Sequence, residues 1–195
     1  MNLFLWGALP YIAFTFLIVG TLVRFFYFER NWTTKSSEFL EKKQLRIANP
    51  LFHFGLLCVI GGHVVGVLIP KTWTAAIGIN DHMYHEGALY MGAVAGIIFI
   101  VGFLLLMKRR FTVPAMKVNT SGLDKWLYLF LTLAIFSGMA GTLLNASGFF
   151  DYRVSIGPWF RSLISFMPDP SLMEGVPFMF KFHMLAWMVV AIIFP

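Results

Sequence analysis

The sequence is poor in charged residues and in cysteine, and both shortages narrow the kind of protein that it can encode. Charged side chains make up 12% of its 195 residues, about half of what a soluble domain carries. Hydrophobic residues make up 58%, and the mean hydropathy is +0.76. The single cysteine, Cys58, excludes an internal disulfide, a CxxC redox pair and a cysteine-ligated cluster within the chain. We therefore predict a protein that crosses a membrane several times.

The sequence also lacks a long polar stretch and a basic N-terminal region. Its start, MNLFLWGALPY, carries no basic residue, which argues against a cleaved signal peptide. Without a soluble domain, chemistry on a bulky soluble substrate must occur in another subunit. Basic residues orient membrane proteins, so we assign the net charge of +6 to membrane topology and predict no nucleic-acid partner.

Five apolar segments are long enough to cross a bilayer as helices. They cover residues 3–28, 49–70, 87–107, 126–145 and 176–195. We predict an all-α fold, an integral membrane bundle of five transmembrane helices that forms one domain over residues 1–195. The motifs Gly62-x-x-x-Gly66 and Gly92-x-x-x-Gly96 offer faces on which helices could approach closely. Between the last two segments, PWFRSLISFMPDP is typical of a short helix on the membrane surface.

The basic residues predict the orientation of the bundle. Eleven of the 15 Lys and Arg lie in or beside the two polar segments that follow the first and third apolar segments. The other four are Lys71, Arg153, Arg161 and Lys181. The positive-inside rule places the larger group in the cytoplasm. We therefore predict that the N-terminus is outside and that the last apolar segment runs inward.

Two histidines lie within the second apolar segment, NPLFHFGLLCVIGGHVVGVLIP, and we predict that the proline near each end marks the boundary of this span. His53 and His63 are ten residues apart, which on one helix separates them by about 15 Å along the axis. Ionisable side chains inside a membrane are costly and so indicate function. Their different depths predict two sites, one toward each side of the membrane. A single histidine could instead bond a neighbouring helix or relay protons, and that alternative stays open here.

His183 lies near the outer end of the last apolar segment, at the depth predicted for His63. Two imidazoles that face each other from different helices can hold haem b through its iron. Gly61, Gly62 and Gly66 would leave room for a flat macrocycle. The matched depths therefore predict a haem between His63 and His183.

His53, toward the cytoplasmic side, needs a partner of its own to hold a second haem. At about 1.5 Å per residue, that partner should follow His183 by one or two dozen residues. The sequence stops twelve residues after His183, at Pro195. We therefore expect the missing ligand, and a C-terminal cytoplasmic tail, to lie beyond the sequence.

His82 and His85 fall in the predicted outer loop, residues 71–86. The simpler interpretation is that they are solvated loop residues. The alternative is a quinone site at the outer surface, where a histidine could accept the proton that quinol releases on oxidation.

Three stretches together resemble the gamma subunit of respiratory nitrate reductase, a membrane di-haem cytochrome b that oxidises quinol. They are the second apolar segment, the LLLMKRR exit from the third, and GVPFMFKFHMLAWM in the fifth. The resemblance covers essentially all 195 residues. It implies two haem b groups and a bacterial or archaeal cell membrane. It also implies partners on the cytoplasmic face: an iron–sulfur beta subunit and a molybdenum alpha subunit.

The resemblance also implies roles for single residues. His63 and His183 would be the axial ligands of the outer haem. His53 would be one ligand of the inner haem, whose other ligand in the family follows a Phe-Pro step. In this sequence that step is Phe194-Pro195, where the chain stops.

By the same resemblance, quinol would bind beside the outer haem, close to Gly62 and His63. Some relatives carry a lysine in the outer loop that contacts quinol. Here the corresponding stretch is NDHMYHEG, which has no lysine. We expect His82, Tyr84 or His85 to take its place.

Arg109 and Arg110 follow the third apolar segment. One hypothesis is that they pair with the propionates of the inner haem. The simpler interpretation is that they are surface charges that set the topology.

The predicted function is electron transfer from menaquinol or ubiquinol at the outer face, through two haems, to partner subunits that reduce nitrate to nitrite. Two alternatives remain at this point. One is a cytochrome b anchor of another quinol-linked reductase, of the heterodisulfide-reductase or sulfite-reduction type. The other is a haem-free anchor or transporter, which is less favoured because no apolar segment is broken by paired Gly and Pro near its middle.

Overall fold

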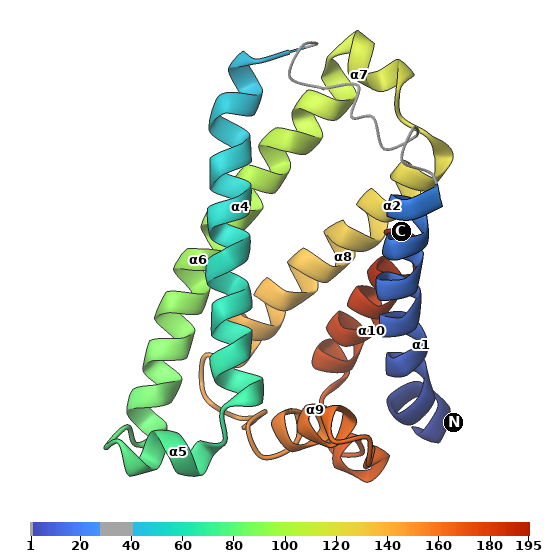
Figure 1. Ribbon diagram of the computed structural model, residues 1–195. Helices are drawn as coiled ribbons and strands as arrows, with labels where there is room; N and C mark the ends of the chain where they lie inside the picture. The colour runs from blue at the N-terminus through green and yellow to red at the C-terminus, as the bar shows by residue number, and fades with distance from the viewer. Residues whose placement is uncertain (1, 28–40) are drawn as a thin grey trace.

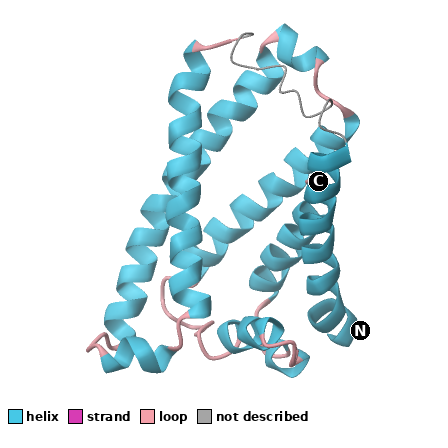
Figure 2. Ribbon diagram, viewed as in Figure 1, coloured by secondary structure: helices cyan, strands magenta, loops and turns pink. Residues whose placement is uncertain are grey.

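The computed structural model describes residues 2–27 and 41–195, and within these ranges the chain forms helices and turns but no strand (Figure 1; Figure 2). The predicted all-helical fold is confirmed. Two of the basic residues that predict the orientation, Arg30 and Lys35, lie outside the described residues.

Four helical segments have the length and the apolar composition needed to cross a membrane. In chain order they are Phe4–Tyr27, Lys43–Leu68, Asp81–Thr112 and Gly122–Leu144. The first segment consists of η1 (Phe4–Ala8), α1 (Leu9–Thr15), η2 (Phe16–Gly20) and α2 (Thr21–Tyr27), in which η1 and η2 are π-helical turns. The second consists of α4 (Lys43–His63) and the π-helical turn η4 (Val64–Leu68). The third and fourth are α6 (Asp81–Thr112) and α8 (Gly122–Leu144).

The fifth predicted span is also helical, but it is shorter. This helix, α10 (Phe178–Ile193), has 16 residues, fewer than the roughly 20 that usually span a bilayer. The structure therefore supports four to five spans, and the outside location of the N-terminus stays a prediction.

The long helices pack in two groups (Figure 1). α4 packs most extensively against α6, and α8 packs against α10, which α1 covers on its other side. The short helices α5 (Lys71–Ala76) and α9 (Ile156–Ile164) lie at the end of the molecule that holds the N-terminus, and α7 (Pro114–Val118) lies at the opposite end. The two ends correspond to the predicted outer and cytoplasmic sides, respectively.

Glycines set the close crossing of α4 and α6, but they are not the predicted ones. A Cβ on Gly55 would lie 2.5 Å from the backbone nitrogen of Phe99, and one on Gly102 would collide with the backbone of Phe52. Gly62 and Gly92, from the predicted motifs, have no neighbouring atom within 4 Å of such a Cβ. The other glycine of each motif lies against side chains of neighbouring segments, Gly66 against Tyr84 and Tyr152, and Gly96 against Met139. The predicted motifs therefore contribute contacts with side chains, while Gly55 and Gly102 allow the close approach of the two backbones.

α4 begins at Lys43, six residues before the predicted start of the apolar segment, so that Pro50 lies inside the helix. Proline lacks an N–H and usually disrupts a helix interior. Membrane helices tolerate it where neighbouring helices and local adjustments satisfy the freed backbone group. The prediction that proline marks the start of this span was wrong.

α6 begins at Asp81 because Asn80 caps it: the Asn80 side chain accepts a hydrogen bond from the backbone N–H of Met83 at 2.9 Å. The predicted outer loop of residues 71–86 is therefore wrong in its second half. His82, Tyr84 and His85 lie in the first turns of a long helix, which fixes the direction of each side chain.

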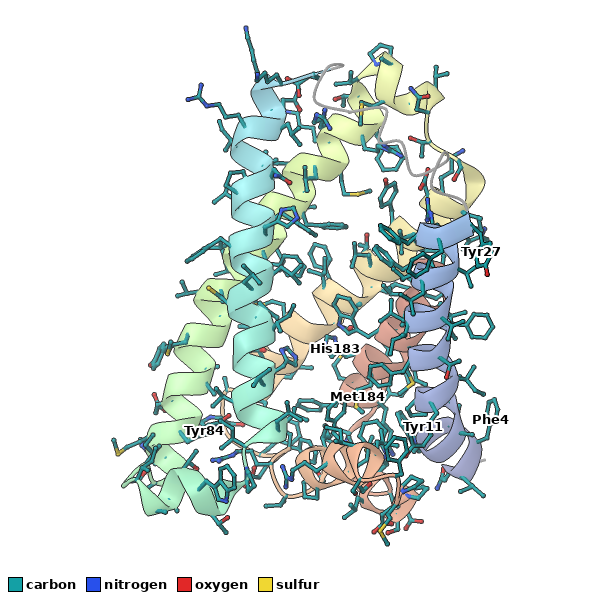
Figure 3. All side chains as sticks on the ribbon, viewed as in Figure 1. Phe4, Tyr11, Tyr27, Tyr84, His183 and Met184 are labelled. Atoms are coloured by element: carbon teal, nitrogen blue, oxygen red, sulfur yellow. The ribbon has the colours of Figure 1, made fainter. Side chains whose placement is uncertain are left out.

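The predicted surface helix is confirmed as α9, and it is also packed inward. Trp159 is 1% exposed, and its Nε1–H donates to the backbone oxygen of Trp6 at 2.8 Å. Tyr11, labelled in Figure 3, donates its hydroxyl hydrogen to the Leu163 carbonyl at 2.9 Å. These bonds attach α9 to the N-terminal helix, so the outer end of the bundle is closed by a fixed helix.

A cluster of opposite charges joins α5, α6 and the segment after α8. Lys71 Nζ lies 2.8 Å from Asp81 Oδ2 and 3.1 Å from Asp151 Oδ2. The Asp81 carboxylate, and next that of Asp151, raises the pKa of Lys71 above its ordinary value. The three segments are therefore held together electrostatically at the outer end.

Replacing Lys71 with methionine is expected to lower the free energy of unfolding by about 0.5 kcal/mol, because partly exposed ion pairs contribute little. A lysine whose pKa is raised by folding stabilises fully below its ordinary pKa, and this stabilisation is lost as the pH rises through the raised value. Thermal unfolding in detergent should therefore separate wild type from Lys71→Met at about pH 8 more than at about pH 11. The control is Lys108→Met, at an exposed lysine with no ion pair to a described residue. Equal separation at both pH values would contradict the assignment.

Candidate functional site

His63 and His183 face each other from α4 and α10, and His63 is exposed while His183 is half-buried. His63 is the last residue of α4, and His183 lies in the second turn of α10. Their ring centres are 6.0 Å apart, and the ring planes differ by 25°. Figure 3 shows His183 among the central helices. The structure thus brings together two histidines 120 residues apart in the sequence, as predicted from their depths.

The hydrogen bonds of these histidines identify the nitrogen that is available to a ligand. His63 Nδ1 lies 2.7 Å from the Val59 oxygen, and His183 Nδ1 lies 2.8 Å from the Ala134 oxygen. A carbonyl oxygen only accepts, so Nδ1 carries the hydrogen in both rings. The lone pair of each neutral ring is then on Nε2, which is the form that binds a metal.

Small residues of α8 make room for His183, and the sequence analysis missed them. A Cβ on Gly138 would lie 2.7 Å from Cε1 of His183. Next to it, buried Ser137 places its Oγ 3.3 Å from His183 Nδ1. The only signal in the sequence was the run of small residues SGMAGT, which membrane helices often carry for packing alone.

The space beside His183 is lined mostly by small and apolar residues. A cavity of about 60 Å³ lies between α4, α6, α8 and α10. Its lining includes Gly92, Gly96 and Gly138. On α4, Gly61 and Gly62 have no atom within 4 Å of where a Cβ would be. The prediction that glycines leave space beside the histidines therefore agrees with the geometry at Gly61 and Gly62, but not at Gly66, against which Tyr84 and Tyr152 lie.

His53 lies on α4 toward the other end of the bundle. It is exposed, its ring packs edge-on against Phe52 at 5.2 Å, and its Nδ1 donates to the Asn49 oxygen at 2.9 Å. Its Nε2 therefore carries the lone pair, as in the other two histidines. Among the described residues, no group of three or more His, Cys, Asp and Glu is placed to hold a metal ion.

The outer candidates occupy different positions on α6. The Tyr84 hydroxyl lies 3.4 Å from that of Tyr152 and against Gly66, and Figure 3 shows Tyr84 at the outer end. His85 Nε2 donates to the Ala146 carbonyl at 3.1 Å. His82 is exposed. The three predicted candidates therefore do not form one cluster, and among them only Tyr84 contacts η4, the turn that directly follows His63.

Arg153 packs against Tyr84. The sequence analysis did not predict this contact. This arginine is 5% exposed, and its guanidinium lies 3.7 Å from the centre of the Tyr84 ring. Its Nη2 donates to Thr74 Oγ1 at 2.6 Å. Burial, and next the Tyr84 hydrogen bond, raises the pKa of Tyr152. The two hydroxyls therefore lie next to each other, with the buried guanidinium of Arg153 over the Tyr84 ring.

The two arginines after the third apolar segment are not simple surface charges. Arg109 is 3% exposed and donates from Nε to Glu41 Oε2 at 2.9 Å, while Arg110 Nη2 donates to Asp124 Oδ2 at 3.2 Å. Both line a cavity of about 220 Å³ between α4, α6, α7 and α8. The surface interpretation is wrong for Arg109, and pairing with haem propionates stays a prediction.

These features define a multi-pass helical membrane protein with a facing pair of histidines on two of its helices. Comparison with known families makes the assignment more specific. The chain belongs to the nitrate reductase gamma subunit family, whose profile matches residues 2–195.

Individual relatives agree with this assignment. The nitrate reductase gamma chain of Bacillus subtilis (strain 168) is 47% identical over 192 residues, which cover 98% of this chain and 86% of that protein. The respiratory nitrate reductase 1 gamma chain of Escherichia coli (strain K12) is 27% identical over 197 residues, covering 100% and 87%. The nitrate reductase-like protein NarX of Mycobacterium tuberculosis (strain CDC 1551 / Oshkosh) is 37% identical over 97% of this chain and 30% of that protein. These matches support a membrane subunit of respiratory nitrate reductase.

Proposed function

We propose that this chain carries haem b and oxidises quinol for a respiratory nitrate reductase. Family membership supports its place in such a complex. The observation that carries the proposal further is the facing arrangement of His63 and His183, with ring centres 6.0 Å apart and both Nδ1 atoms bonded to carbonyls.

The histidine pair fits the requirements of one haem iron. Two imidazoles on a single metal should have ring centres about 6 Å apart, because each metal–nitrogen bond is about 2 Å and each ring nitrogen lies about 1.1 Å from its ring centre. The separation of 6.0 Å matches this value. The open surfaces of Gly61 and Gly62 supply space beside the pair. We infer that His63 and His183 hold the outer haem.

The histidines and the groups bonded to them would have different roles in this function. A bound haem accepts and passes on one electron at a time. His63 and His183 would hold the haem through Nε2, and the Val59 and Ala134 carbonyls would keep the hydrogen of each ring on Nδ1. His53, about 15 Å further along α4, would hold a second haem nearer the cytoplasmic side.

The direction of electron flow follows from the predicted orientation. Quinol oxidised at the outer end would release its protons outside, and its electrons would pass inward by way of the haems that His63 and His53 would hold. Separation of protons from electrons makes the step electrogenic. The electrons would leave through an iron–sulfur beta subunit to a molybdenum alpha subunit, where nitrate is reduced to nitrite.

Among the outer candidates, we assign Tyr84 to the quinol. Its hydroxyl lies against Gly66 of η4, the helical turn that directly follows His63, so Tyr84 contacts the segment next to that histidine. A tyrosine hydroxyl can hydrogen-bond a quinol oxygen. The other two candidates are placed less well, because His85 is bonded to Ala146 and His82 is exposed.

Replacing Tyr84 with phenylalanine is expected to raise the KM for quinol about five- to tenfold, because one hydrogen bond of roughly 1 kcal/mol is lost. The measurement is nitrate reduction by the assembled complex in membranes, driven by a quinol. A soluble dye that delivers electrons directly to the cytoplasmic subunits should support the wild-type rate.

Two matched variants make this test specific. Tyr90→Phe removes a hydroxyl from a tyrosine that is 66% exposed on the same helix, and it should keep the wild-type KM. Tyr152→Phe removes the partner but keeps the Tyr84 hydroxyl, so its effect should be the smaller one. A wild-type KM for quinol in Tyr84→Phe would remove Tyr84 from the site, and full quinol-driven activity in His63→Ala would overturn the proposed function.

A further inference from the structure

The hydrogen bonding of His183 differs from that of His63, because a side-chain hydroxyl takes part in it. Ser137 is 6% exposed and comes from α8, a different helix from the histidine. Its Oγ lies 3.1 Å from the Ala134 oxygen and 3.3 Å from His183 Nδ1. His183 Nδ1 lies 2.8 Å from the same Ala134 oxygen. Three polar atoms thus form a compact triangle between α8 and α10.

The chemistry of the three atoms fixes the direction of the bonds. The Ala134 oxygen only accepts, so it receives hydrogens from both His183 Nδ1 and Ser137 Oγ. The Ser137 oxygen in turn accepts from His183 Nδ1–H, but at 3.3 Å it is a weaker acceptor than the Ala134 oxygen at 2.8 Å. Two donors on one carbonyl share its electron density, which weakens the bond that each of them makes. Around His63 the described residues supply only the Val59 oxygen at 2.7 Å, from its own helix. The shared acceptor is therefore specific to one member of the pair.

A hydrogen bond from Nδ1–H to a carbonyl makes an imidazole a stronger electron donor to a metal on its other nitrogen. Stronger donation favours the oxidised metal, and hydrogen bonding around the axial ligands is one of the means by which proteins set haem potentials. Because the Ser137 hydroxyl also donates to the Ala134 oxygen, it would weaken the hydrogen bond from His183 Nδ1 and so reduce the electron donation of His183 to the metal.

We propose that Ser137 is a positioning residue that raises the reduction potential of the haem held by His63 and His183, by competing with His183 for the Ala134 carbonyl. The inference rests on the proposed haem ligation. It assigns a function to a buried serine of α8 that touches neither quinol nor iron.

The test is a potentiometric titration of haem absorbance in membranes that contain the assembled complex. Ser137→Ala removes the competing donor and should lower the potential of the outer haem alone. We expect the ratio of oxidised to reduced haem at a fixed ambient potential to rise three- to tenfold, and a tenfold change corresponds to about 59 mV for one electron. Ser137→Cys keeps a weaker donor and should give a smaller shift in the same direction.

Thr132→Ala is the matched control. Thr132 is on the same helix and donates its hydroxyl hydrogen to the Tyr128 carbonyl at 2.6 Å, without a bond to a histidine. It should keep the wild-type potential. An unchanged reduction potential of the outer haem in Ser137→Ala would overturn the inference. Loss of the outer haem from both Ser137 variants would also overturn it, because the hydroxyl would then be needed for haem binding. Loss in Ser137→Ala alone, with the smaller shift in Ser137→Cys, would support it.

The same titration separates this inference from the proposed function. His183→Ala should remove the outer haem whatever Ser137 does. If His183→Ala keeps that haem, the ligation itself is wrong. If His183→Ala loses the outer haem and Ser137→Ala keeps the wild-type reduction potential, the haem ligation stands and only the proposed role of Ser137 is wrong.

Discussion

Replacing His183 with alanine is expected to remove one haem b from the protein and to stop quinol-driven nitrate reduction. The ring of His183 faces His63 at 6.0 Å, and no other histidine ring is placed against His63 in the described part of the chain. Alanine offers no nitrogen to iron, and water is a poor substitute in an apolar cavity. The loss should appear as a decrease in the reduced-minus-oxidised haem absorbance per complex.

Two controls separate ligation from general damage. His85→Ala removes an imidazole that is bonded to the Ala146 carbonyl, at the outer end of α6, and it should keep the full haem content. In His183→Ala, electrons from a dye that reacts with the cytoplasmic subunits should still reduce nitrate. Full haem content in His183→Ala would show that the residue is not a ligand.

Replacing Gly102 with valine is expected to destabilise the pair formed by α4 and α6, by at least about 3 kcal/mol, the upper part of the usual range for overpacking. A Cβ at Gly102 collides with the backbone of Phe52, and the reciprocal position, Gly55, lies against the backbone of Phe99. Backbone atoms cannot rotate away as the end of a side chain can, so the two helices would have to separate.

The measurement is thermal unfolding of the purified protein in detergent, compared with Gly92→Val. Gly92 is on the same helix, but a Cβ there meets no atom within 4 Å. We expect a large loss of stability in Gly102→Val and little or none in Gly92→Val, because a Cβ at Gly92 meets no neighbour and valine is a better helix former than glycine. Equal effects at the two positions would show that the close crossing is not important for stability.

The sequence was sufficient to predict the helical class and the histidine pair, because both depend on long-range regularities. Apolar runs of bilayer length predict helices, and the depth of a residue follows from its distance to the end of its run. That arithmetic placed His63 opposite His183 without any knowledge of the packing. It could not place the helix crossing, because the contact surface of a helix depends on small differences in rotation.

The errors have local physical causes. The loop predicted around His82 and His85 is helical because the Asn80 side chain caps α6, and this short-range hydrogen bond extends the helix beyond its apolar part. The start of α4 was misplaced because proline was taken as a boundary, although Pro50 lies within the helix. In both cases hydrophobicity indicated the membrane segment and missed the ends of the helix.

The residues that contact His183 and Tyr84 could not be predicted from the sequence, for a different reason. Ser137, Gly138 and Arg153 act through contacts with segments that are distant in the sequence. A serine or a glycine in a membrane helix is common and usually serves packing. Only the three-dimensional arrangement shows that Ser137 and Gly138 touch His183, and that Arg153 covers Tyr84.

The pairing of His63 with His183 is tested most directly by potentiometric titration of haem absorbance in membranes that contain the wild-type complex, His63→Ala, His183→Ala or His53→Ala. We predict that His63→Ala and His183→Ala lose the same redox component, and that His53→Ala loses a different one. Loss of different components from His63→Ala and His183→Ala would contradict the pairing.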